Sequence, residues 1–120
     1  MNQVELRLYV EDHCDALLKI FQKGELGNFY NIGSNINLKN KDLVKKILKV
    51  AKLKVKIGKN VKIKFVKDRP GHDARYSLNS SKINKNINWK SKTSLNEGLK
   101  KTISWYLNNI SYYSTINKKD

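Results

Sequence analysis

The chain has 120 residues, 39% of them hydrophobic and 29% charged, and a formal net charge of +15. This length suits one small domain or part of a larger one, and no apolar stretch is long enough to cross a bilayer. The single cysteine, Cys14, excludes an internal disulfide, and the absence of a Cys/His cluster predicts no metal site. Early charged residues (Glu5, Arg7, Glu11 and Asp12) are unlike a signal peptide and favour a cytoplasmic protein without a membrane partner.

The positive charge comes mainly from lysine, since 22 lysines stand beside only three arginines. Residues 39–67 hold twelve lysines and one acidic residue, Asp42. A basic surface attracts polyanions, so a small nucleic-acid-binding module is one open interpretation. The shortage of arginine weighs against it, because the guanidinium fork is the group best suited to phosphate and base recognition.

The spacing of apolar residues predicts short strands alternating with four helices, an α/β chain. The strands are expected at 6–10, 28–32 and 61–66, with 75–78 extended, and the helices at about 12–23, 41–53, 79 or 80 to 83, and 95–107. Asp12 and Asn40 are predicted N-caps, and Ser94 opens a capping box that Glu97 completes. Trp89 is predicted to lie in the core, and residues 111–120 are expected to form a polar, frayed tail.

The most informative stretch is Asp68-Arg69-Pro70-Gly71-His72-Asp73, which contains the only proline of the chain. Proline followed by glycine is typical of a type II turn, which would bring Arg69 and His72 within about 7 Å of each other. A guanidinium and an imidazole that converge in this way can bind one phosphate. The competing interpretation is a structural turn whose charges pair with Asp68 and Asp73.

Several segments together resemble the C-terminal third of a dTDP-glucose 4,6-dehydratase, an extended short-chain dehydrogenase/reductase of the NAD-dependent epimerase/dehydratase family. They occur in the order of that family: Leu8–His13, Tyr30–Gly33, Asn40, Asp68–Asp73 with Arg75-Tyr76, Ser81–Ile83, Trp89 and Gly98–Leu107. The Asp-Arg-Pro-Gly-His-Asp run is specific to this dehydratase group. The Tyr-Asn-Ile-Gly and Trp-Tyr segments are shared more widely among sugar-nucleotide epimerases and dehydratases. The resemblance covers roughly residues 6–109.

The resemblance implies an α/β C-terminal lobe in which residues 1–110 bind a nucleotide sugar and 111–120 form the tail. The complete enzyme would be a homodimeric lyase that converts dTDP-glucose to dTDP-4-dehydro-6-deoxyglucose. Its NAD would oxidise C4 of the glucose unit, water would leave across C5 and C6, and hydride would return to C6. The implied substrate contacts are Asn40, Asp68, Arg69, Pro70, Gly71 and His72.

The sequence also departs from the family pattern. No Gly-x-x-Gly-x-x-Gly motif follows a strand and no Tyr-x-x-x-Lys pair occurs. The NAD-binding Rossmann domain is therefore expected to be missing, with a separate chain as one source of it, and this chain alone is predicted to bind no NAD and to be inactive. It would be a truncated frame or one half of a split gene.

One departure falls on a substrate contact. The family's substrate-binding arginine corresponds to Glu5, which would repel phosphates. Arg7, on the same strand face, is the available replacement. Another nucleotide-sugar dehydratase or epimerase is the alternative within the family.

Overall fold

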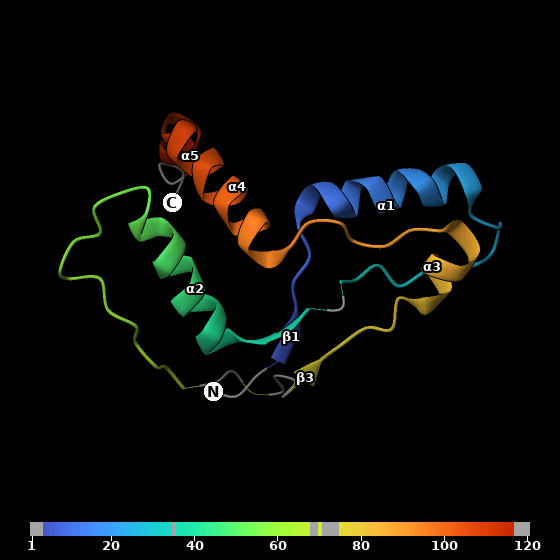
Figure 1. Ribbon diagram of the computed structural model, residues 1–120, viewed down its shortest axis with the longest axis horizontal. Helices are drawn as coiled ribbons and strands as arrows, with labels where there is room; N and C mark the ends of the chain where they lie inside the picture. Colours follow the sequence, from blue (N-terminus) through green and yellow to red (C-terminus); the bar gives the residue numbers. More distant parts are fainter. Residues whose placement is uncertain (1–3, 35, 68–69, 71–74, 117–120) are drawn as a thin grey trace.

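The computed structural model describes residues 4–34, 36–67, 70 and 75–116. Three strands and five helices occur in this part of the chain: β1 Val4–Leu6, α1 Val10–Lys23, β2 Asn37–Lys39, α2 Asn40–Lys52, β3 Arg75–Tyr76, α3 Ser81–Ile87, α4 Leu95–Asn108 and α5 Ile110–Ile116. Figure 1 shows two arms, α1 with α3 and α2 with α4, on either side of β1. The α/β class is as predicted, with one helix more than the four expected, because residues 110–116 form α5 and not a frayed tail.

The three strands form one small sheet in the order β2-β1-β3. β1 runs antiparallel to β2, with Val4 opposite Lys39, and parallel to β3, with Val4 opposite Arg75. A backbone hydrogen bond from Arg7 N to Ile36 O (3.2 Å) extends the first ladder by one step. Because β2 runs into α2 without a loop, this pairing fixes the start of α2 beside β1.

The main core lies under α1. It consists of Ala16 from α1, Ile83 and Ile87 from α3, and Trp89. Trp89 is 2% exposed, which confirms its predicted core position, and its indole Nε1 donates to Asp15 Oδ2 at 3.1 Å. The two isoleucines are four residues apart and therefore share one side of α3.

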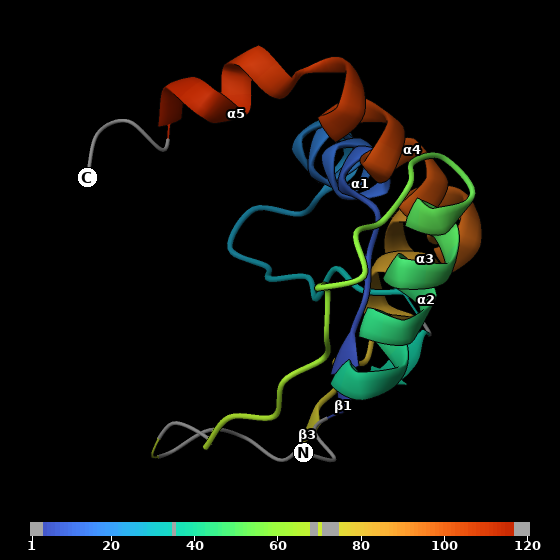
Figure 2. The ribbon, with the colours of Figure 1, turned by 90° about the vertical axis from the view of Figure 1, so that its left-hand side faces the viewer.

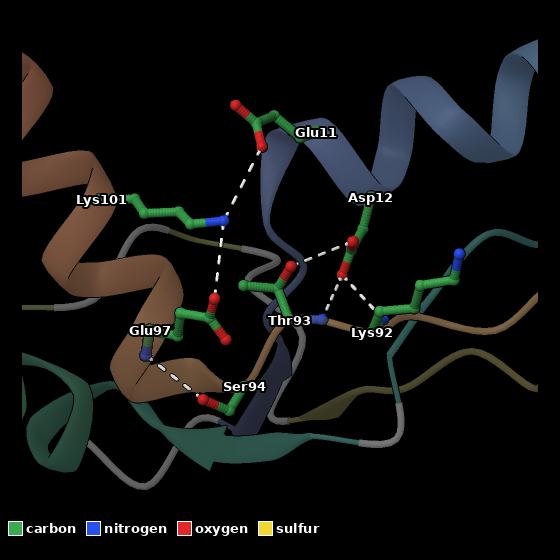
Figure 3. Close-up of polar contacts among 7 residues, drawn as sticks. All are labelled: Glu11, Asp12, Lys92, Thr93, Ser94, Glu97 and Lys101. Carbon is green, nitrogen blue, oxygen red and sulfur yellow. Dashed lines mark hydrogen bonds and ion pairs between the residues drawn. The ribbon is translucent and has the colours of Figure 1, made fainter.

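A buried carboxylate ties α1 to the segment that enters α4. Asp12 is 9% exposed and accepts hydrogen bonds from Lys92 N (3.0 Å), Thr93 N (2.9 Å) and Thr93 Oγ1 (3.0 Å) (Figure 3). The prediction that Asp12 is an N-cap is wrong, since α1 begins at Val10 and its N-cap, Tyr9, makes no side-chain cap bond. The carboxylate is used instead for a contact eighty residues away in sequence.

The predicted N-cap of the last helix is confirmed. Ser94 is the N-cap of α4, and its hydroxyl accepts from Glu97 N at 3.3 Å. Lys101, one turn further on, lies between two carboxylates, at 3.6 Å from Glu97 and 4.0 Å from Glu11 (Figure 3). Both ion pairs are exposed, and the pair with Glu11 adds a second, weaker link between α1 and α4.

Two predicted strands are not formed. Residues 28–34 and 61–67 are irregular, although Tyr30 and Ile32 still pack against the core. A strand needs a neighbour to accept and donate its backbone hydrogen bonds, and the described residues supply none beside these segments. The predicted strand at 6–10 ends at Leu6, and β2 was missed because its three residues include a single apolar side chain, Leu38.

We expect Asp12→Ala to lower the free energy of unfolding by about 3 kcal/mol or more. The reason is that it removes a charged acceptor of roughly 1.5–3 kcal/mol per bond and leaves backbone donors unpaired. For a domain of this size the melting temperature should fall by about 10 °C. Glu11→Ala is the matched control, because it removes a carboxylate from the same turn whose side chain is 71% exposed. Equal losses of melting temperature in the two variants would contradict a special role for Asp12.

Candidate functional site

Three polar side chains meet where β1 faces the start of α2. Arg7 Nη2 forms an ion pair with Glu5 Oε2 at 2.9 Å and donates a hydrogen bond to Asn40 Oδ1. Asn40 Nδ2 in turn donates to Glu5 Oε1 at 3.1 Å. The side chains thus close a ring, which we call the Glu5–Arg7–Asn40 cluster. The side chains of Arg7 and Glu5 are 27% and 28% exposed, so the cluster is open to solvent on one side only.

The backbone explains why these residues meet. Side chains two residues apart on an extended segment point to the same side, which brings Glu5 and Arg7 together. Ser34, itself buried, donates from its hydroxyl to the carbonyl of Arg7 and accepts from Ile36 N at 3.2 Å. Hydrogen bonds to both the N–H and the carbonyl of Arg7 therefore fix its backbone independently of its side-chain contacts.

Asn40 does not cap α2 as predicted. The N-cap is Lys39, which makes no side-chain cap bond, and Asn40 is the first helical residue. Its side-chain amide instead forms hydrogen bonds with Glu5, which lies in β1, and with Arg7, which follows β1 directly. The first turn of α2 thus presents its backbone N–H groups, and the positive end of its dipole, next to a guanidinium.

The Arg7 guanidinium keeps unused donor capacity. Its Nε is buried and has no hydrogen-bond acceptor among the described residues. A buried donor without an acceptor costs roughly 1–3 kcal/mol, so an acceptor supplied by a ligand would relieve that cost. Arginine suits a phosphate acceptor, because its planar fork matches two oxygens at once.

A cleft of about 740 Å³ opens between α2, α4 and the start of α1. Figures 1 and 2 show α2 and α4 side by side along it. Arg7 lines this cleft together with Tyr9, while Leu43, Ile47 and Leu99 supply apolar wall. Desolvation and the nearby carboxylate of Glu11 raise the pKa of the Tyr9 phenol above its ordinary value, so its hydroxyl is uncharged at neutral pH. The cleft can therefore offer the cations of Arg7 and Lys101 and the neutral hydroxyl of Tyr9 beside an apolar surface.

The structure brings together two of the predicted substrate contacts, Arg7 and Asn40. Asp68, Arg69, Gly71 and His72 lie outside the described residues, and the phosphate clamp of Arg69 and His72 stays a prediction. Pro70 is described and is exposed. β3 begins directly after this run and pairs with β1 on the side opposite β2. The run therefore leads into the same sheet that carries the Glu5–Arg7–Asn40 cluster.

Sequence reasoning missed two contributors to the site. Glu5 was expected to repel phosphates, yet its carboxylate is bound by Arg7 and Asn40. The spacing of opposite charges at positions i and i+2 of a strand was the available signal. Ser34 carries no comparable signal, because its role depends on which carbonyl the fold places beside it.

Two absences hold for the described residues only. Within them no group of three or more His, Cys, Asp or Glu residues could hold a metal ion. No helix in that part of the chain is long and apolar enough to cross a membrane.

Comparison with known proteins extends these observations. Residues 2–102 match the model of the family described as GDP-mannose 4,6 dehydratase. The chain is 40% identical over 116 residues to the dTDP-glucose 4,6-dehydratase of Haemophilus influenzae, a match that covers 92% of this chain and 34% of that protein. For dTDP-glucose 4,6-dehydratase 1 of Escherichia coli K12 the identity is 37% over 117 residues, covering 96% and 32%. The chain belongs to this family of nucleotide-sugar dehydratases, which confirms the resemblance drawn from its motifs.

Solved structures give the same result for the fold. The dTDP-glucose 4,6-dehydratase of Bacillus anthracis, determined in complex with NAD, matches with a TM-score of 0.78 and 34% identity over 92% of this chain. DesIV of Streptomyces venezuelae, a dTDP-glucose 4,6-dehydratase with NAD and TYD bound, matches with a TM-score of 0.81 and 29% identity. In both cases the match covers 33% of the solved chain. The present chain therefore spans about one third of the length of these relatives.

Among the described residues, the connection between β1 and α1 does not fit the NAD found in those relatives. A dinucleotide pyrophosphate is held by a glycine-rich turn that joins a strand to the N-terminus of a helix. Here β1 is joined to α1 by Arg7-Leu8-Tyr9, which contains no glycine. Gly24 and Gly27 instead follow α1, and the segment after them is irregular.

We expect Glu5 and Arg7 to be energetically coupled. Arg7→Met would leave the Glu5 carboxylate partly buried without its cation, and Glu5→Gln in the same chain should recover part of the loss. A double-mutant cycle on thermal unfolding should give a coupling of about 1 kcal/mol. The exposed pair of Glu97 and Lys101 is the control, for which about 0.3–0.5 kcal/mol is expected. A coupling no larger than that of the control would mean that the cluster is only a surface ion pair.

Proposed function

We propose that this chain is the substrate-binding part of a dTDP-glucose 4,6-dehydratase, a lyase that uses NAD in its complete form. The observation that carries the proposal is the meeting of Arg7 and Asn40 at the start of α2, on a fold shared with enzymes of that name. DesIV, one of those enzymes, was solved with TYD bound. Residues 1–110 would form the binding region, and the polar segment after it, which includes most of α5, would lie outside it.

In this proposal Arg7 binds the diphosphate of the nucleotide sugar. Its unpaired Nε and the first-turn N–H groups of α2 supply donors, and Asn40 fixes the position of the guanidinium. Glu5 contacts the same nitrogen of the guanidinium as Asn40 does, so the charge of Glu5 is already compensated when a phosphate arrives. Because the net charge of the cluster is then close to zero, affinity should depend on hydrogen-bond geometry more than on attraction at a distance.

Arg69 and His72 would add a second set of donors to the same diphosphate, with Asp68, Pro70 and Gly71 shaping the turn that carries them. Hydride transfer and elimination require the NAD-binding part of the family, so we propose that the chain alone has no turnover. The complete enzyme would be a homodimer, as the family resemblance implies. Supply of the NAD-binding part by a separate chain is compatible with the same division of labour.

A second nucleotide is a specific alternative. Glu5 stands where the family resemblance places a substrate-binding arginine, and the matching family model carries a GDP-mannose name. A different nucleotide-sugar dehydratase or epimerase would explain both features. Comparing dTDP, UDP and GDP as ligands separates these possibilities, whereas a nucleic-acid module would prefer an oligonucleotide and lose affinity steeply with added salt.

The test is a titration of the 120-residue chain with dTDP, followed by NMR at about 0.15 M ionic strength. We expect shifts at Arg7, Asn40 and the first turn of α2. Arg7→Lys should weaken binding about ten- to a hundredfold, because a lysine keeps the charge but not the bidentate fork. Lys23→Gln, a charge change at the end of α1 outside both the cluster and the cleft, should leave the affinity unchanged. Binding that is equal in all three proteins would refute the role of Arg7.

The clamp predicted at Arg69 and His72 is tested separately. Arg69→Lys should cost roughly 1.5–3 kcal/mol of dTDP binding, and His72→Ala should cost less, because a neutral histidine makes an ordinary hydrogen bond. If the turn has only a structural role, the opposite result is expected. In that case Arg69→Lys lowers the melting temperature while the affinity for dTDP stays the same.

A further inference from the structure

A row of apolar side chains on the outer face of α1 has no covering element in the described part of the chain. Its members lie at positions i, i+4, i+7, i+8 and i+11 of the helix and therefore share one side. We call this row the α1 stripe; it consists of Val10, Cys14, Leu17, Leu18 and Phe21. Leu17 is 52% exposed and Phe21 is 89% exposed, so the largest side chain of the row is also the least protected.

The opposite side of α1 is already occupied. Asp12 and Ala16 are buried there, and Ile20 packs against the core formed with α3 and Trp89. In Figure 1, α3 and the segment leading to α4 lie below α1, and no helix or strand lies above it. A helix that is apolar on two sides is typical of an element enclosed between two layers. Only one of these layers is present here.

The overall dimensions agree with a missing layer. The radius of gyration is 17.3 Å, whereas a compact domain of this length has about 14 Å. The main core contains four buried residues, a small number for a chain of 120. The relatives that share this fold are about three times as long as the present chain.

From these observations we infer that the α1 stripe is the docking surface for the remaining two thirds of the family fold, the part outside the matched third. The contact forms whether that part continues the same polypeptide or is a separate chain. The inference rests on family membership and on the exposed stripe, and it does not depend on which nucleotide is bound.

A second copy of this chain is a poorer occupant. With a net charge of +15, two copies repel each other as they approach. A partner whose contact face is apolar with a neutral or acidic rim meets no such barrier. The stripe follows a helix of 14 residues, about 21 Å long, which suits the centre of a specific interface of about 800 Å² per partner.

The other exposed aromatic group is a weaker candidate. Trp105 packs edge-to-face on Tyr106 and Tyr112, and Tyr106 packs in the same manner on Tyr113. These rings already cover part of one another within α4 and α5. The side chains of the α1 stripe have no comparable contacts among the described residues, so Phe21 is the anchor that we expect a partner to bury.

The test is co-expression of the 120-residue chain with an affinity-tagged polypeptide made of the two thirds of the Haemophilus influenzae relative outside the match. We expect the tagged polypeptide to retain the chain as a one-to-one complex in light scattering. Leu17→Asp and Phe21→Asp should each reduce the retained chain about tenfold or more. Ile110→Asp is the matched control, since this α5 residue is 64% exposed and should not change retention. Circular dichroism should show that all three variants keep their helices.

Three results would overturn the inference. One is a tagged polypeptide that is purified without the chain, or that stays insoluble when the chain is co-expressed. Another is equal loss of retention with Ile110→Asp. The third is a homodimer of the chain alone that Phe21→Asp disrupts, because the stripe would then serve a second copy. Association is measured without nucleotide, so a chain that docks but does not bind dTDP would leave this inference standing and remove the proposed function.

Discussion

The relative placement of the two arms depends on the buried carboxylate of Asp12. It accepts three hydrogen bonds from Lys92 and Thr93, directly before the N-cap of α4. A half-turn of backbone with two inward N–H groups would be unstable without an acceptor, and a charged one is the strongest available. Since α4 packs beside α2, the position of the cleft wall is set by this contact at the start of α1. One side chain thereby links the core under α1 to the candidate site.

The Glu5–Arg7–Asn40 cluster shows how a change of charge can be absorbed locally. A carboxylate at position 5 would repel phosphates if it stood alone, but here two donors engage it. The family resemblance implies an arginine at position 5, and Arg7, two residues along the chain, lies on the same face, because side chains alternate along an extended backbone. The cost is that part of its hydrogen-bonding capacity is spent on Glu5 and Asn40, while Nε stays available.

Four of the five helices were predictable from the sequence to within a few residues, whereas α5 and the strands were not. The spacing of Leu43, Val44 and Ile47 was enough to locate α2, since the hydrogen bonds of a helix lie within the segment itself. The capping serine of α4 is equally local. The role of Asp12 was not predictable, because its partners are eighty residues away. Asn40 was placed correctly at the start of α2, but its partner was predicted wrongly. An asparagine side chain suits a helix cap and a tertiary contact equally well, and the partners of the tertiary contact are distant in sequence.

Two segments that were predicted as strands are irregular, and the reason is the same as for the exposure of one side of α1. Residues 61–66 alternate apolar and lysine side chains as a half-buried strand does, yet Val61 and Phe65 are exposed. The alternation of apolar and polar side chains indicates which face of a strand would be buried. It does not provide the neighbouring strand that the backbone hydrogen bonds require. The outer face of α1 is apolar in the same sense, with no element laid against it. The hydrogen bonds within each helix are therefore formed in the described part of the chain. Several contacts that need a second layer or a neighbouring strand are not formed there. That pattern agrees with the inference that the outer face of α1 meets the part of the family fold outside the matched third, and it is consistent with the radius of gyration of 17.3 Å.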